Sequence, residues 1–369
     1  MLHSLLSNIS STAIFIIVLS ILIIVHEWGH FITAKRLGFK VEEFSLGFGP
    51  KLFSCMHNGT EYMIKLIPLG GYVKMFGDDR SQCRGVPEEF YSQPPGHRAL
   101  VVLNGPVVNF ILAYVCLFFV FILGYPDLST KIGVLSDGYP AKEAGLQVGD
   151  KIIRINGQAI DGWTALQNKI STSEEPNLVI ELLRDGQPMQ KTVVPRIEKT
   201  KNIFGQMKET HIMGIRPSEE IVTFKYSPGM AFVKAYEKLA EITTLTYKSF
   251  YFMLTGSMSA KDSMTGPIGI FYIVKSAAEM GFSHLLFILG VISASLAIFN
   301  LLPVIPLDGG HLLLLAIEKI RGKALPAKID EYIARIGFSL IICLAIFVFY
   351  SDFSRFGWID KLKHLIPFK

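Results

Sequence analysis

The segment His26-Glu27-Trp28-Gly29-His30 carries the residues most capable of chemistry in this chain of 369 residues. Positions i and i+4 of a helix share one face, so both imidazoles can reach a single metal ion. Glu27 lies beside them, where a carboxylate can act as general base toward water. The alternative is a histidine pair that makes hydrogen bonds between helices. The spacing favours a zinc site with hydrolytic chemistry.

A third zinc ligand is expected from elsewhere in the chain, because a catalytic zinc normally has three protein ligands and one position for water. Asp308 is the natural candidate. Pro303 and Pro306 precede it and should interrupt the helix, and irregular backbone at membrane depth is tolerated only inside protein or along a wet cavity. His311 competes with it from one helical turn further on. We favour Asp308, because a carboxylate also offsets the metal charge, and expect His311 to support the ligands from outside.

These candidate ligands lie in apolar stretches that are long enough to cross a bilayer, which takes ~20 helical residues. Hydrophobic residues make up 50% of the chain and charged residues only 18%. A net charge of +5 is too small to indicate a nucleic-acid partner. Four membrane-spanning helices are therefore predicted, at about residues 11–33, 99–124, 283–317 and 333–351.

The distribution of lysine and arginine predicts the orientation of these helices, because positive residues collect on the cytoplasmic side. Nine basic residues lie in the loop 34–98, and four follow the third predicted span. Both loops are expected in the cytoplasm, with the N-terminus and residues 125–282 outside. The first and third spans then run in the same direction. The His26–His30 segment and Asp308 should therefore meet in the cytoplasmic half of the membrane.

The chain between the second and third spans has the character of a separate domain. Residues 126–222 are polar, turn-rich and strand-like. Residues 223–282 contain an amphipathic helix at about 229–255, predicted from apolar residues at helical spacing. The predicted membrane parts are then residues 1–125 and 283–369.

A β-hairpin is predicted at about residues 61–76 of the first cytoplasmic loop. Strand-like segments at 61–67 and 72–76 flank Gly70-Gly71. Such a hairpin could dip into the membrane beside the first span and pair with an unwound substrate by strand addition. An ordinary cytoplasmic hairpin is the alternative. The candidate substrate-binding residues are Gly70, Gly71, Tyr72 and Val73.

The complete pattern resembles the site-2 protease family of intramembrane zinc metalloproteases, and within it the bacterial regulator-of-sigma-E protease branch. The resemblance covers nearly the full length. The matching segments are HEWGH at 26–30, PLGGYVKM at 68–75, GPVVN at 105–109, TGPIGI at 265–270 and LDG at 307–309. It implies that His26, His30 and Asp308 bind zinc, that Glu27 is the catalytic base, and that Asn300 contacts the substrate backbone.

The resemblance also implies a fold, a substrate class and a location. Residues 126–222 should form a PDZ-like α+β domain outside the cytoplasm, which recognises peptide ends or excludes substrates with large outer segments. The activity should be hydrolysis within or near the transmembrane segment of single-pass proteins, such as an anti-sigma factor or remnant signal peptides. The location should be the bacterial inner membrane. Well-studied relatives carry two PDZ domains where this chain has room for one, and Ile305 stands where the family usually has a second proline.

Two other function classes would use the same features. A zinc transporter needs a polar path across both leaflets, which the outer halves of the first and third spans do not offer. A non-enzymatic membrane scaffold would leave the intramembrane ionisable residues without a purpose. The sequence therefore predicts an α-helical membrane protein with about four transmembrane helices, a membrane-associated β-hairpin and one inserted PDZ-like domain. Zinc is the expected cofactor, and the lipid bilayer and single-pass membrane proteins are the expected partners.

Overall fold

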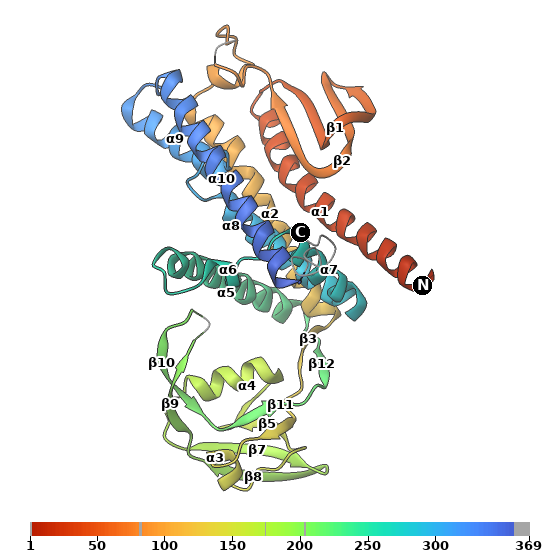
Figure 1. The fold of residues 1–369 in the computed structure, drawn as a ribbon, viewed down its shortest axis with the longest axis vertical. Coiled ribbons are helices and arrows are strands. Elements are labelled where there is room, and N and C mark those ends of the chain that lie inside the picture. Colours follow the sequence, from red (N-terminus) through yellow and green to blue (C-terminus); the bar gives the residue numbers. More distant parts are fainter. Residues whose placement is uncertain (1, 81–82, 174, 203, 358–369) are drawn as a thin grey trace, which may run out of the picture. The chain divides into compact units, whose positions relative to one another are not determined.

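The computed structural model describes residues 2–80, 83–173, 175–202 and 204–357. Its contacts divide the chain into two compact units. The first comprises residues 1–118, 235–248 and 260–369, and the second comprises residues 119–234 and 249–259. Figure 1 shows the helices and strands of both.

Among the described residues, four helices are long and apolar enough to cross a membrane. They are α1 (Leu2–Arg36), α2 (Pro95–Leu123), α8 (Phe282–Asn300) and α10 (Ala327–Arg355). The four predicted spans are thus found, but the third is shorter than predicted. It ends at Asn300, and α9 (Asp308–Arg321) begins after an irregular loop that contains Pro303 and Pro306. Proline interrupts a helix because it removes a backbone donor and clashes with the preceding turn.

Apolar side chains hold the helices of the first unit together. Val18 and Leu22 of α1 are buried against Val274 of α7 (Pro267–Met280). Asp352 of α10 is fully buried and accepts hydrogen bonds from the backbone amides of Gly266 and Gly269 at the start of α7. These amides have no partner within their own helix, so the carboxylate caps it. The short helices α6 (Ala260–Ser263) and η1 (Phe90–Ser92) complete this unit, together with the middle of α5 (Pro228–Leu254).

The strands of the first unit are β1 (Val41–His57) and β2 (Thr60–Met75), which pair antiparallel beside α1 (Figure 1). Asn58-Gly59 forms the turn between them with positive φ at both residues, the conformation that Asn-Gly favours in a two-residue hairpin. Residues 43–46 of β1 pair with 61–64 on one side and with 71–74 on the other.

The predicted hairpin over 61–76 needs a correction. Its two segments belong to the single strand β2 and each pairs with β1, not with the other. The turn lies at Asn58-Gly59, and Gly70-Gly71 lie inside β2. The glycine pair was misread because glycines also mark places where two pieces of backbone approach closely. Gly71 is such a place: an added Cβ would lie 2.9 Å from the Ser45 carbonyl oxygen.

The second unit is rich in strands. A four-stranded sheet has the order β6-β5-β7-β8, and the pairs β4–β11, β3–β12 and β9–β10 lie outside it. The strands are β3 (Tyr125–Leu128), β4 (Ile132–Leu135), β5 (Lys151–Ile155), β6 (Gln158–Ala159), β7 (Leu178–Arg184), β8 (Gln187–Val193), β9 (Arg196–Lys201), β10 (Met207–Ile212), β11 (Ile215–Pro217) and β12 (Ile221–Phe224). The helices are α3 (Pro140–Glu143) and α4 (Gly162–Ser171). Ile152, Leu166 and Ile180 are fully buried in its core.

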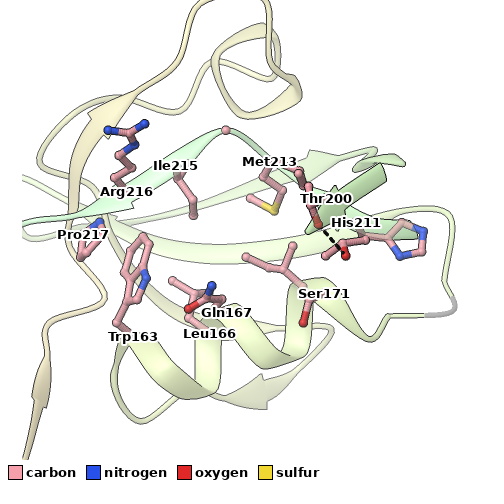
Figure 2. A pocket seen from close by; sticks show the side chains of 14 residues that line it. Trp163, Leu166, Gln167, Ser171, Thr200, His211, Met213, Ile215, Arg216 and Pro217 are labelled. Atoms are coloured by element: carbon pink, nitrogen blue, oxygen red, sulfur yellow. Dashed lines mark hydrogen bonds between the residues drawn. The ribbon is translucent and has the colours of Figure 1, made fainter. Parts of the chain in front are cut away.

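A groove of about 450 Å³ lies in this second unit between α4 and the chain around β11. Figure 2 shows Trp163 and Leu166 of α4 on one side, with Met213 and Ile215 on the other. Thr200 and Thr210, which are hydrogen-bonded to each other at 3.1 Å, line one end of it. Its lining is mainly apolar, with backbone of the short edge strand β11 along one wall.

Candidate active site

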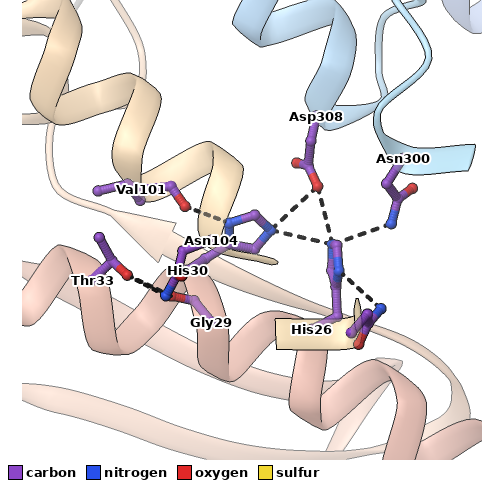
Figure 3. A network of polar contacts seen from close by, with 9 residues as sticks. His26, Gly29, His30, Thr33, Val101, Asn104, Asn300 and Asp308 are labelled. Carbon is purple, nitrogen blue, oxygen red and sulfur yellow. Dashed lines mark hydrogen bonds and ion pairs between the residues drawn. The ribbon is translucent and has the colours of Figure 1, made fainter. Parts of the chain in front are cut away.

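The two histidines of the first span lie on one face of α1, and Asp308 reaches the same point from α9 (Figure 3). The Nε2 atoms of His26 and His30 are 3.2 Å apart. Asp308 Oδ2 lies 3.2 Å from His26 Nε2 and 3.6 Å from His30 Nε2. The sequence therefore predicted correctly that these three side chains meet, although 278 residues separate His30 from Asp308.

Asp308 is brought there by a tight connection between α8 and α9. It is the first residue of α9, directly after the interrupted segment 301–307. Gly309 and Gly310 pack against that segment so closely that a Cβ on either would overlap backbone atoms of Leu301 or Ile305. The two glycines thus allow this close packing, which places the Asp308 carboxylate against α1.

Helix α2 packs against the other side of the histidine pair. Gly105 lies directly on both imidazole rings, and an added Cβ would overlap the His30 ring and lie 3.0 Å from His26 Cε1. Directly before His30 on α1, Gly29 lies against α2: an added Cβ would be 2.4 Å from the Asn104 carbonyl oxygen. The Asn104 side chain donates to the Gly29 carbonyl at 3.0 Å and to Thr33 Oγ1 at 2.6 Å. Glycines at this crossing therefore allow α1 and α2 to approach, as small residues do between membrane helices.

The outer nitrogen of each imidazole has a polar neighbour on α2, and each Nε2 lies toward Asp308. His30 Nδ1 lies 2.9 Å from the Val101 carbonyl oxygen and must donate to it, so the lone pair is on Nε2. His26 Nδ1 lies 3.3 Å from the Asn109 amide, whose buried Oδ1 has no hydrogen-bond partner. Exchanging the amide N and O atoms lets Oδ1 accept the Nδ1 proton, and His26 then has the same tautomer.

The converging atoms fit a zinc ion. Three lone-pair atoms lie 3.2–3.6 Å apart, and the buried Asp308 Oδ2 has no hydrogen-bond donor. Ligand atoms of a tetrahedral site with bonds of ~2.0–2.1 Å are roughly 3.3 Å apart. A cation would therefore satisfy all three atoms at once. Two imidazoles and one carboxylate are the donor set of a catalytic zinc, with one coordination position left for water.

The other predicted site residues have different surroundings. Asn300 Nδ2 lies 3.3 Å from His26 Nε2, at the edge of the converging ligands. Glu27 is half-buried, and Gly71 of β2 lies against it: an added Cβ at Gly71 would be 3.1 Å from Glu27 Cγ. His311 lines a separate small cavity and is not among the three converging ligands of the described residues.

The remaining hairpin residues do not converge on the candidate metal ligands. An added Cβ on Gly70 would overlap the ring of Phe48. The Tyr72 hydroxyl donates to Glu43 Oε2 at 2.5 Å, and Val73 packs in the apolar cluster beneath the sheet. Of the four hairpin residues predicted to bind substrate, Gly71 is therefore the one found beside Glu27.

Sequence reasoning missed the roles of α2 at this site. Val101, Gly105 and Asn109 each contact a histidine, and Ser293 of α8 donates to the Asn109 carbonyl at 2.8 Å. The signal was a glycine followed four residues later by an asparagine in a span without charge. A polar side chain inside an apolar helix usually has a partner there.

The chain was compared with known proteins. The profile described as Peptidase family M50 matches residues 14–344. A protein of Campylobacter jejuni that carries the name of a zinc metalloprotease is 34% identical over 343 residues, which cover 92% of each chain. The regulator of sigma-E protease RseP of Escherichia coli is 31% identical over an alignment of 456 residues, with 95% of this chain and 100% of the relative covered. Protease RseP of Yersinia pestis is 30% identical with the same coverage.

Three findings agree: the family profile matches most of the chain, the relatives are similar over nearly their full length, and four helices are apolar enough to cross a membrane. This chain therefore belongs to peptidase family M50, the site-2 protease family, and is a membrane zinc metalloprotease.

Proposed function

We propose that this protein hydrolyses peptide bonds within or near the transmembrane segment of single-pass proteins of the bacterial inner membrane. The observation that carries the proposal is the meeting of two imidazoles from one apolar helix with a carboxylate that follows another. Ionisable side chains within apolar helices are costly and mark functional sites. The three side chains lie toward the helix ends that are followed by loops rich in lysine and arginine. Such loops lie in the cytoplasm, which supports a site that water reaches from that side.

His26, His30 and Asp308 would hold the zinc, which when bound acts as a Lewis acid and makes water a nucleophile at neutral pH. The chain's own groups supply the rest of the chemistry. The Glu27 carboxylate takes a proton from the attacking water and later gives it to the leaving amine nitrogen. The Asn300 amide donates a hydrogen bond to the substrate backbone. Val101 and Asn109 keep the two imidazoles in the tautomer that binds metal.

Strand addition to β2 would present the substrate. Among the strands that the structure describes, residues 71–74 pair only with β1, on one side, and Gly71 lies beside Glu27. An unwound substrate segment paired along this edge keeps its backbone hydrogen bonds, which it requires within the membrane. Leu52, Phe53 and Met56 of β1 are more than 60% exposed, which suits a sheet that lies partly in lipid.

The second unit would select substrates outside the cytoplasm. We assign a PDZ-like domain to residues 126–222, because α4 and the edge strand β11 border a groove suited to an extended peptide. It would either bind peptide ends or exclude substrates whose outer domain has not been removed. The name of the Escherichia coli relative supports signalling by cleavage of an anti-sigma factor. Remnant signal peptides are the alternative substrates, because their cleavage needs the same hydrolysis of a peptide bond in a single membrane helix.

The Glu27→Gln variant tests this function. It keeps a side chain of the same size and all three proposed ligands, so it should bind one zinc per chain and cleave no membrane substrate. Membrane proteomes of cells with the native protein or the variant are then compared. Single-pass fragments that accumulate only with the variant are the substrates. Unchanged membrane fragments, or cleavage by purified Glu27→Gln protein, would contradict the proposal.

A further inference from the structure

A buried ion pair joins α2 and α9 away from the converging ligands. Arg98, in the first turn of α2, is 2% exposed, and Glu318, near the end of α9, is 9% exposed. An Arg98 Nη2 hydrogen bond to Glu318 Oε1 connects them, and Arg98 Nε donates to the Gln93 carbonyl at 3.0 Å. Burying two charges costs free energy, and their mutual attraction is effective only in a restricted geometry. The chemistry proposed above does not use this pair.

On α2, Arg98 lies on the same face as the residues that contact the histidines. Arg98, Val101, Gly105 and Asn109 are three, four and four residues apart, which aligns them along one side of a helix. Val101 accepts from His30, Gly105 contacts both rings, and Asn109 contacts His26. Helix α2 therefore connects the Arg98 guanidinium at one end of this row to the residues that contact His26 and His30.

On α9, Glu318 lies on the same side as Asp308. Asp308, His311, Leu315 and Glu318 follow one another at three, four and three residues. His311, Leu315 and Glu318 line one cavity of about 40 Å³ together with Arg98, so this end of the α9 row faces the start of α2. The two rows run in opposite directions. Arg98 meets Glu318 at one end, and the histidines beside Gly105 meet Asp308 at the other.

Further contacts hold Glu318 from a second direction. Arg80 Nη2 lies 3.4 Å from Glu318 Oε2, while Arg80 Nη1 lies 2.7 Å from Asp330 Oδ2 at the start of α10. Both guanidinium groups contact the Tyr91 ring, at 4.6 Å for Arg80 and 5.5 Å for Arg98. The position of α9 along its own axis is thus fixed at Glu318.

A buried carboxylate, Glu89, binds the described residues just before Tyr91. Glu89 accepts from the Cys83 thiol at 3.0 Å and from three consecutive backbone amides at 2.8–3.0 Å. These hydrogen bonds lower the pKa of Glu89 to about 2, so the group stays charged and keeps its donors. The described residues 83–86, which come before Tyr91, are therefore held by one carboxylate.

We propose that Arg98 and Glu318 are positioning residues for Asp308: their ion pair sets the register of α9 against α2 and so places the carboxylate against the imidazoles. The proposal rests on the proposed role of Asp308 as a zinc ligand. Only the irregular segment 301–307 joins α9 to α8, so α9 needs a second anchor. A slip of one residue would move Asp308 by about 1.5 Å along the axis and rotate it by about 100°. A displacement of about 1 Å can cost roughly 100-fold in rate.

The test is a double-mutant cycle read out by zinc affinity. Glu318→Gln is made in the native protein and in Asp308→Asn, and the zinc Kd of each purified protein in detergent is measured by chelator competition. We expect Glu318→Gln alone to weaken zinc binding by about tenfold or more, as loss of a group that orients a ligand does. In the Asp308→Asn background it should weaken binding no further, because the residue it positions is already gone.

Two further variants keep the test decisive. Glu331→Gln removes a comparable charge from α10, where Glu331 and Arg335 form a pair with both side chains 69% exposed, and should leave the zinc Kd unchanged. If Glu318→Gln fails to fold, the Arg98→Gln/Glu318→Gln double variant replaces it, because it leaves no unpaired buried charge. Its zinc affinity should fall in the native background and not in Asp308→Asn.

Three outcomes would overturn the proposal. An unchanged zinc Kd in Glu318→Gln, with Asp308→Asn impaired, removes the positioning role and leaves the proposed function intact. An equal loss in both backgrounds shows that Glu318 affects the fold in general. Native zinc affinity in Asp308→Asn removes the ligand assignment, and the positioning role with it.

Discussion

The candidate metal centre and the groove of the second unit differ in how closely their neighbours constrain them. At the metal centre each histidine has a fixed partner on its outer nitrogen, and Gly105 lies against both rings. The groove is lined mainly by apolar side chains and by backbone of a short edge strand. A site built from rare polar groups at fixed distances determines a reaction. A site built from apolar surface and a strand edge accepts many extended peptides and determines only a class of ligand.

The largest effect should come from filling the space between α2 and the histidines. Gly105→Val would put methyl groups into the His26 and His30 rings, so α2 must move or the rings must rotate. We expect at least a roughly 100-fold loss of zinc affinity together with loss of cleavage. Gly96→Ala is the matched control on the same helix, since an added Cβ there meets nothing within 4 Å. Normal zinc binding by Gly105→Val would mean that the tight packing of α2 is unimportant for the site.

A smaller effect should separate catalysis from metal binding. Gly71→Ala would place its Cβ 2.9 Å from Ile23 Cγ2 and from the Ser45 carbonyl, and 3.1 Å from Glu27 Cγ. Either β2 or the Glu27 side chain must shift, while the three ligands keep their positions. We expect kcat to fall by about 10- to 100-fold with the zinc Kd unchanged. Kinetics and chelator competition on the same preparation check this, with Gly229→Ala as control. A parallel loss of zinc would show that β2 supports the metal centre itself.

The smallest effect concerns the groove. Deletion of residues 130–217 removes most of the strand-rich unit but none of the proposed ligands. If this unit filters by size, cells with the deletion should cleave substrates that retain their outer domain, with turnover of trimmed substrates within a fewfold of native. Slower cleavage of trimmed substrates alone would instead indicate binding of peptide ends. Immunoblots of one substrate with and without its outer domain distinguish the two.

The sequence predicted the polar residues of the membrane helices better than it predicted the strands. The His26–His30 pair, Asp308 and the interrupted third span were predictable, because charged groups in apolar helices and prolines in a helix have few explanations. The hairpin was misplaced because Gly70-Gly71 looks like a turn, whereas Asn58-Gly59 is the turn. The hairpin β9–β10 was not predicted, since its strands are short and mostly polar.

The contacts that Val101 and Gly105 of α2 make with the histidines were beyond sequence reasoning for a different reason. Val101 acts through its backbone carbonyl and Gly105 through the absence of a side chain, so neither has a chemical signature. The Arg98–Glu318 pair joins residues 220 positions apart, and nothing in either local sequence indicates the other. Such contacts depend on how the helices pack.

Zinc binding by Asp308→Asn, compared with Glu27→Gln, tests the central claim most directly. Zinc content and Kd are measured for the two purified variants and the native protein. If two imidazoles and the Asp308 carboxylate hold the metal, Glu27→Gln keeps one zinc per chain with native affinity, and Asp308→Asn loses at least about 100-fold. Native affinity in Asp308→Asn would contradict the account, because the ligand that joins α9 to α1 would then have to be another residue.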